Sequence, residues 1–209
     1  MGRDSWRLKG AGLVVLALAG ILASLAVSVL AITGIATGLR LAVKPPSSHP
    51  RAAGGETVDE AMTIETGKMD GHPGWPRYTN AFWTVHEAQT VVLRITSYDD
   101  GTAPLAGVQT MLDKVSGTVS GTETVNGKTV RSVPNTQIAH TFTIVGLGLN
   151  LPIPASPTGG TVTVVARFVA QRSGSFTWQC YAPCGSGSNA MGGAMSMTGW
   201  MEGRVDVLA

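Results

Sequence analysis

The 209-residue sequence predicts an all-β domain preceded by a single N-terminal membrane helix. The first observation behind this prediction is that residues 12–39 contain no charged side chain. The second is a series of short runs rich in β-branched residues, separated by glycine, proline and asparagine. The third is that the rest of the chain contains no long amphipathic stretch with the period of a helix. Together these observations favour an antiparallel sandwich or barrel behind an anchor.

The uncharged stretch is long enough to cross a bilayer. As a helix, residues 12–39 rise ~42 Å, which exceeds the ~30 Å of a bilayer's hydrocarbon core. A cleaved signal peptide is the competing interpretation, but the apolar region of such a peptide is usually about 7–15 residues long. We therefore expect an uncleaved transmembrane anchor at residues 12–39, with residues 1–11 in the cytoplasm.

Basic residues flank the anchor equally on both sides, so the positive-inside rule does not set its orientation. They are Arg3, Arg7 and Lys9 before the anchor, and Arg40, Lys44 and Arg51 after it. The rest of the chain favours export because it is β-rich, carries few charges and lacks a cytosolic cofactor motif. We expect a single-pass protein of the cell membrane whose C-terminal domain is extracytoplasmic.

Residues 40–74 are predicted to be a linker and irregular segment. Proline, serine and glycine between Lys44 and Gly55 pack poorly and are typical of a tether. The folded body is expected to begin near Trp75 and to occupy residues 75–209.

The folded body is predicted to consist of short strands. Asn126 and Gly127 separate two extended runs and favour a hairpin near residues 115–133, because a type I′ turn needs positive φ at both central residues. The expected strands occupy residues 90–97, 115–125, 128–133, 138–145, 161–170, 175–180 and 203–208.

Composition and motifs exclude several function classes. Charged residues make up only 13% of the chain and the net charge is +2, without a basic cluster of the kind that binds nucleic acid. The sequence has no nucleophile elbow, phosphate-binding loop or dinucleotide fingerprint. Asp99 and Asp100 are adjacent in a predicted turn, which gives little support to general acid–base catalysis. An electron carrier or accessory subunit is favoured over a stand-alone enzyme.

The residues that carry chemistry gather around the two cysteines of the sequence. Cys180 ends a predicted strand, Cys184 follows in a glycine-rich loop, and Met191 lies further along that loop. His140 lies inside another predicted strand, where its imidazole is held rigidly. Thiolates, an imidazole and a thioether form the soft ligand set that copper selects.

Residues 174–185 resemble the copper loop of cytochrome c oxidase subunit II, a membrane-anchored cupredoxin with a dinuclear CuA centre. In that family the loop reads Cys-x3-Cys-x3-His-x2-Met, and Cys180, Cys184 and Met191 stand at the matching spacings. His140 and the phenylalanine two positions later match the family's upstream histidine strand. The resemblance implies a cupredoxin-like Greek-key β-sandwich over the body of the chain. It also places the family's backbone-carbonyl ligand at Ala182.

The sequence departs from this family at three points. Ser188 stands where the loop's histidine belongs, residues 98–139 form an insertion, and one membrane helix is predicted where the family usually has two. Serine is a poor copper ligand, so one ion of a dinuclear centre would lose its imidazole. The remaining set of His140, Cys180, Cys184 and Met191 predicts a single copper, used for electron transfer or copper delivery in a respiratory chain. Its expected partners are the membrane and a redox protein or respiratory complex.

A second interpretation needs no metal. In an oxidising compartment two neighbouring cysteines form a disulfide, and a Cys180–Cys184 bridge would contribute on the order of 2 kcal/mol or less. The chain would then be a cupredoxin-like structural or assembly subunit. Other candidate ligands are weaker, because His72 and His86 are typical of surface or turn positions. Met195 is typical of a packing residue.

Overall fold

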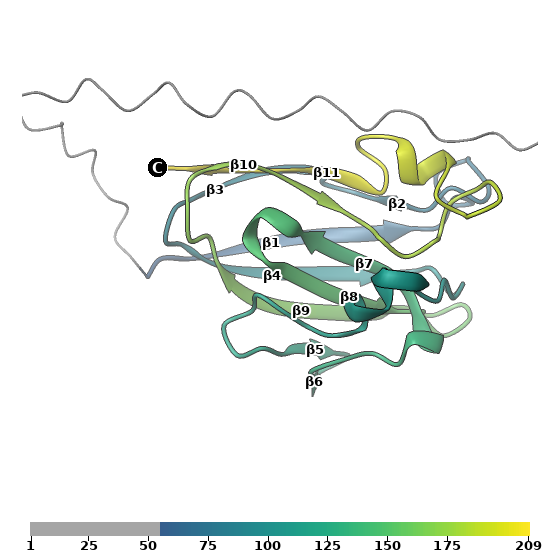
Figure 1. The fold of residues 1–209 in the computed structure, drawn as a ribbon, viewed down its shortest axis with the longest axis horizontal. Coiled ribbons are helices and arrows are strands. Elements are labelled where there is room, and N and C mark those ends of the chain that lie inside the picture. Colours follow the sequence, from purple (N-terminus) through teal and green to yellow (C-terminus); the bar gives the residue numbers. More distant parts are fainter. Residues whose placement is uncertain (1–54) are drawn as a thin grey trace, which may run out of the picture. The chain divides into compact units, whose positions relative to one another are not determined.

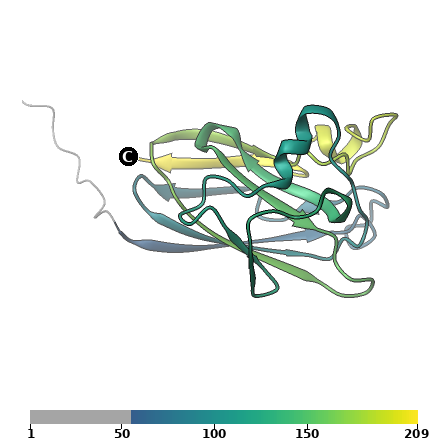
Figure 2. The same cartoon turned by 60° about the horizontal axis from the view of Figure 1, so that its bottom comes forward.

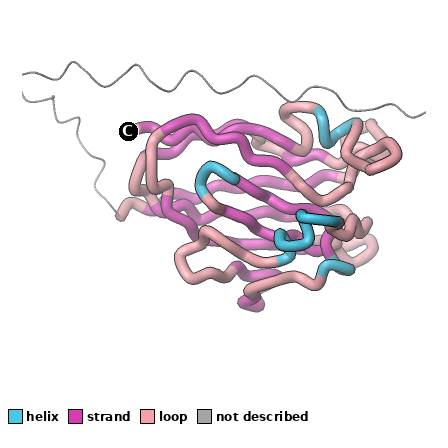
Figure 3. Tube along the Cα trace, viewed as in Figure 1, coloured by secondary structure: helices cyan, strands magenta, loops and turns pink. Residues whose placement is uncertain are grey.

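The computed structural model describes residues 55–209. The predicted cytoplasmic segment 1–11, the predicted anchor 12–39 and the first part of the predicted linker lie outside these residues. Within the described part of the chain, no helix is long and apolar enough to cross a membrane. Strands dominate it, and the helical segments are short 3-10 turns (Figure 3). These turns are η1 (Gly107–Asp113), η2 (Asn135–Gln137), η3 (Val145–Leu147) and η4 (Gly193–Ser196).

The strands of the described residues form two sheets, of six and five strands. The first sheet has the order β2 (Arg77–Tyr78), β1 (Thr57–Glu65), β4 (Thr90–Ser97), β9 (Val162–Val169), β5 (Glu123–Val125) and β6 (Lys128–Val130). The second has the order β3 (Phe82–His86), β11 (Glu202–Leu208), β10 (Gly174–Gln179), β7 (Ile138–Ile144) and β8 (Leu149–Pro154). The β1–β4 and β3–β11 pairs are parallel and the other pairs are antiparallel. The two layers face each other across the core (Figures 1 and 2).

The all-β sandwich expected from the sequence is confirmed, and so is the hairpin turn. Asn126 and Gly127 have φ values of 48° and 79°, and β5 and β6 pair on either side of them. The strand predicted over residues 115–125 is wrong for most of its length, since only Glu123–Val125 is extended into a strand. Turns at Gly117 and Gly121, with φ of 72° and 65°, interrupt the rest.

The predicted start of the folded body near Trp75 is also wrong. Strand β1 lies inside the segment expected to be irregular, and all of its residues from Thr57 to Ile64 pair with β4. The acidic residues of β1 conceal its alternation of apolar and polar side chains in the sequence, but Met62 and Ile64 are buried. Strand β8 was not predicted either, because it contains Pro152 and Pro154. It is the edge strand of its sheet, where proline is tolerated.

The centre of the core is an aromatic cluster of Tyr78, Phe142 and Trp178, all fully buried. The ring of Trp178 lies 4.9 Å from that of Tyr78 and 5.2 Å from that of Phe142. Each such pair contributes about 0.5–1.5 kcal/mol beyond area burial. The indole of Trp178 also donates a hydrogen bond to Ala81 O at 2.9 Å. This packing anchors β7 and β10, the two strands that carry the predicted ligands.

Candidate metal centre

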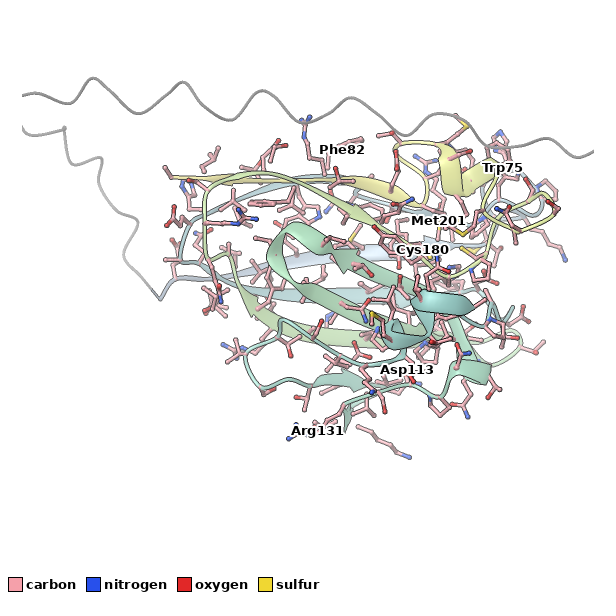
Figure 4. The ribbon with its side chains drawn as sticks, viewed as in Figure 1. Trp75, Phe82, Asp113, Arg131, Cys180 and Met201 are labelled. Atoms are coloured by element: carbon pink, nitrogen blue, oxygen red, sulfur yellow. The ribbon has the colours of Figure 1, made fainter. Side chains whose placement is uncertain are left out.

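Three of the four predicted ligands lie together at one end of the sandwich. The ligand atoms of His140, Cys180 and Cys184 are all within 4.8 Å of one another. His140 and Cys180 are fully buried, and Cys184 is partly buried. Figure 4 shows Cys180 beside Met201, whose carbonyl accepts a hydrogen bond of 2.9 Å from the amide of Cys180. Strand β7 and the segment that follows β10 thus bring one imidazole and two sulfurs together.

Strand β7 supplies the imidazole, and a carboxylate orients it. His140 Nε2 lies 3.0 Å from Asp99 Oδ2, which comes from the segment just after β4. The other ring nitrogen, Nδ1, is buried and has no hydrogen-bond partner within residues 55–209. Metal-ligating histidines commonly donate the N–H of one nitrogen to a carboxylate while the other binds the metal. Nδ1 is therefore the atom of His140 that is free to act as a ligand, and this donor set fits a soft metal ion.

Asp99 also sets the protonation of the metal-free imidazole. Burial lowers the pKa of His140, but the hydrogen bond with Asp99 and the charges of Cys180 and Asp99 outweigh it and raise the pKa to about 9. Burial raises the pKa of Asp99, yet the hydrogen bond and charge of His140 bring it below its usual value. In the absence of a metal the two groups form an ion pair, so a metal ion that binds Nδ1 must displace a proton.

The two sulfurs differ in character. Their separation is 3.6 Å, and both cysteines are free. Burial raises the pKa of Cys180, but its contact with Cys184, the nearby charge of His140 and the backbone amide of Thr141 bring it well below the usual value. The Thr141 amide lies 3.4 Å from Cys180 Sγ. The hydrogen bond with Cys180, together with burial, raises the pKa of Cys184. The surroundings of the two sulfurs thus favour ionisation of Cys180 over ionisation of Cys184.

The thioether nearest the centre comes from Met195. Its Sδ lies 3.2 Å from Cys184 Sγ, and its side chain is only 2% exposed. Met191, which the loop spacing favoured, is partly buried and packs against the core. Met195 is therefore a site residue that the sequence reasoning missed. The sequence shows only that a second methionine, Met195, follows Met191 by four positions. The path of the glycine-rich loop decides which of these two methionines reaches the sulfurs.

The side chains of Ser188, His72 and His86 lie outside the cluster of His140, Cys180 and Cys184. Ser188, which stands where the resemblance would place a histidine, is exposed. The exposed His72 packs its ring 5.1 Å from that of Trp200, and His86 is exposed at the end of β3, as expected for surface histidines. The carbonyl of Ala182 accepts a hydrogen bond from the amide of Cys184 at 2.8 Å and lies 3.7 Å from Cys180 Sγ.

No protein-family model and no curated protein sequence matches the chain. Its structure is similar to that of the copper protein rusticyanin, with 12% identity, a TM-score of 0.38 and coverage of 75% of this chain and 84% of that one. A structure of rusticyanin from Thiobacillus ferrooxidans has 14% identity and a TM-score of 0.35, and the match covers 73% of this chain and 77% of that one. The multicopper oxidase mgLAC has 17% identity and a TM-score of 0.31, and the match covers 73% of this chain and 39% of that one. Likenesses this distant do not assign a function, and the assignment rests on the geometry of the centre.

Proposed function

We propose that the chain is a cupredoxin-like protein that binds a single copper ion through His140, Cys180 and Cys184. One observation carries this proposal: the imidazole that clusters with two free sulfurs has a fully buried nitrogen without a hydrogen-bond partner among the described residues. Burying such a nitrogen without a hydrogen bond is unfavourable, and a bound metal would satisfy it.

The donor set favours copper over zinc. Zinc also binds imidazole and thiolate, but thioethers are characteristic of copper sites, and Met195 contacts Cys184. When bound, copper would supply one-electron exchange between Cu(I) and Cu(II). The chain's own residues would hold and orient it: Asp99 fixes the imidazole ring, and the amide of Thr141 stabilises the Cys180 thiolate.

The biological role that fits this centre is electron transfer or copper delivery in a respiratory chain. The uncharged residues 12–39 support attachment to the cell membrane, with the folded domain on its outer side. A redox protein or a respiratory complex is then the natural partner. Alkaline extraction of membranes tests the attachment: the full chain should stay in the membrane fraction, and a chain lacking residues 12–39 should not.

A copper titration tests the central claim. We expect the full chain to bind one Cu(I), with two sulfurs and one nitrogen in its X-ray absorption spectrum. Cys184→Ser and His140→Ala should each lose tight binding. If the wild type takes up no stoichiometric copper and its unreduced mass shows the loss of two hydrogens, the protein is the disulfide-bonded, metal-free module instead.

A further inference from the structure

A pocket of about 260 Å³ opens beside the centre. Cys184 and Asp99 line it, together with Thr66, Gly67, Lys68, Gly74, Pro76 and Asp100. His140 and Cys180 are fully buried, so among the described ligands Cys184 is the one that the pocket exposes. The pocket therefore connects solvent to the ligand set through a single sulfur.

Part of the pocket lining is a closely hydrogen-bonded turn that follows β1 and contains Thr66, Gly67, Lys68 and Gly74. The amide of His72 donates to Gly67 O at 2.7 Å, and the amide of Trp75 donates to His72 O at 3.0 Å. The turn is so tight that a Cβ atom on Gly67 would lie 2.0 Å from His72 O. Arg77 and Asp70 form an ion pair of 3.1 Å across it. The pocket is therefore a built feature of the fold.

The charges of the lining suit a cation. Asp99 carries a carboxylate paired with His140, and Asp100 adds a second one that is exposed. Lys68 is the basic residue of the lining, and it is exposed. A pocket of this size admits a small ligand or a single side chain and excludes a folded domain.

We propose that this pocket is the passage through which Cu(I) is delivered to and removed from the centre, with Cys184 as the first ligand to bind it and the last to release it. This inference rests on the proposed function, and of its two roles it favours copper delivery over electron transfer. The carrier is a small thiolate complex of Cu(I). A Cu–S bond to Cys184 forms as the bond to the carrier's thiolate breaks, and the Cys184 proton passes to the leaving thiolate. Copper stays Cu(I) throughout.

Narrowing the pocket tests the passage. Thr66→Trp introduces a bulky ring at the lining, and Met69→Trp introduces the same ring in the same turn, at a residue that is 53% exposed and outside the lining. Cu(I)–glutathione loads the full chain, and a Cu(I) chelator removes the ion, both followed by stopped flow. We expect Thr66→Trp to slow loading and removal at least tenfold, with an unchanged equilibrium affinity. Met69→Trp should match the wild type.

Equal rates in Thr66→Trp and Met69→Trp would overturn the passage while leaving the copper site intact. Absence of copper binding in every variant would instead overturn the proposed function. Thiol access gives an independent measurement on the metal-free full chain. A short pulse of iodoacetamide should label Cys184 before Cys180, because the pocket gives access to Cys184 while Cys180 is fully buried, and Thr66→Trp should slow that labelling. If Thr66→Trp fails to fold, judged by circular dichroism, Lys68→Trp replaces it with the same expected results.

Discussion

At the residue scale, the centre depends on one carboxylate that contributes no ligand atom. Asp99 holds His140 Nε2 at 3.0 Å and leaves Nδ1 free. The sequence could supply the ligands, because histidine and paired cysteines are recognisable by type and spacing. It could not supply Asp99, which is separated from His140 by 41 positions and is indistinguishable from its neighbour Asp100 without the fold.

Replacing Asp99 should weaken copper binding without removing a ligand. We expect Asp99→Ala to lower the Cu(I) affinity about 10–100-fold, because the imidazole loses the partner that fixes its orientation. Competition with a Cu(I) chelator measures this affinity. Asp100→Ala is the matched control, since Asp100 is exposed and adjacent, and it should bind like the wild type. Equal losses in the two variants would contradict an orienting role.

The choice between the two methionines can be decided by a matched pair of substitutions. Leucine is close in volume to methionine but has no sulfur, so it tests the thioether itself. Met195→Leu should weaken Cu(I) binding about fivefold, equivalent to ~1 kcal/mol for a weak ligand, because Met195 Sδ contacts Cys184. Met191→Leu should leave the affinity unchanged. A loss of affinity in Met191→Leu but not in Met195→Leu would show that Met191 is the thioether ligand, as the loop spacing of the oxidase family implies.

At the element scale, the strands with local signals were predictable and those with distant partners were not. Strands β4, β7 and β9 are rich in β-branched residues and are flanked by turn residues, so their periodicity identified them. Strand β1 depends on parallel pairing with β4, and the brief β5 depends on pairing with β9. Such partners are set by tertiary structure, which a single stretch of sequence does not encode.

Strand β5 of the inserted hairpin carries a buried acid that should make stability depend on pH. Glu123 is 2% exposed, its carboxyl oxygens have no partner within residues 55–209, and burial raises its pKa to about 9. Between pH 4.5 and about 9 the unfolded chain ionises this group while the folded chain keeps it protonated. The contribution of Glu123 to the free energy of unfolding is therefore complete below pH 4.5. It falls as the pH rises, by up to ~1.4 kcal/mol per pH unit.

Glu123→Gln keeps the shape of this side chain and removes its titration. We expect the variant to be more stable than the wild type by about 2–4 kcal/mol at pH 7.5, with the difference disappearing toward pH 4.5. Urea unfolding of the metal-free protein at several pH values measures it. A difference that stays constant with pH would show that Glu123 is ionised, or hydrated, in the folded protein.

At the scale of the whole molecule, copper binding and folding are linked. The three ligands come from β7 and from the end of β10 with its following loop, so they converge only in the folded domain. A ligand that binds the folded state alone stabilises it by RT ln(1 + [L]/Kd), about 2.7 kcal/mol at a hundredfold excess over Kd.

This linkage predicts a metal-dependent melting temperature. We expect Cu(I), supplied under anaerobic conditions, to raise the melting temperature of the wild type by several degrees. His140→Ala should show little rise, because it loses the imidazole ligand and with it most of the affinity. Calorimetry with and without Cu(I) measures the shift. An equal rise in His140→Ala would mean that copper binds elsewhere on the chain.

The segment of residues 98–139 begins and ends at the centre. Asp99 and His140 stand near its two ends and touch each other, and the amide of Ala103 donates to Ile138 O at 2.7 Å just inside them. The ends of this long segment meet, because the chain entering it and the chain leaving it are already at the distance of a tight turn. Asp99 lies at its entry and His140 directly follows its exit, so closing the segment also orients the imidazole of the centre. A shorter connector built in its place must therefore keep Asp99 and the hydrogen bond between Ala103 and Ile138.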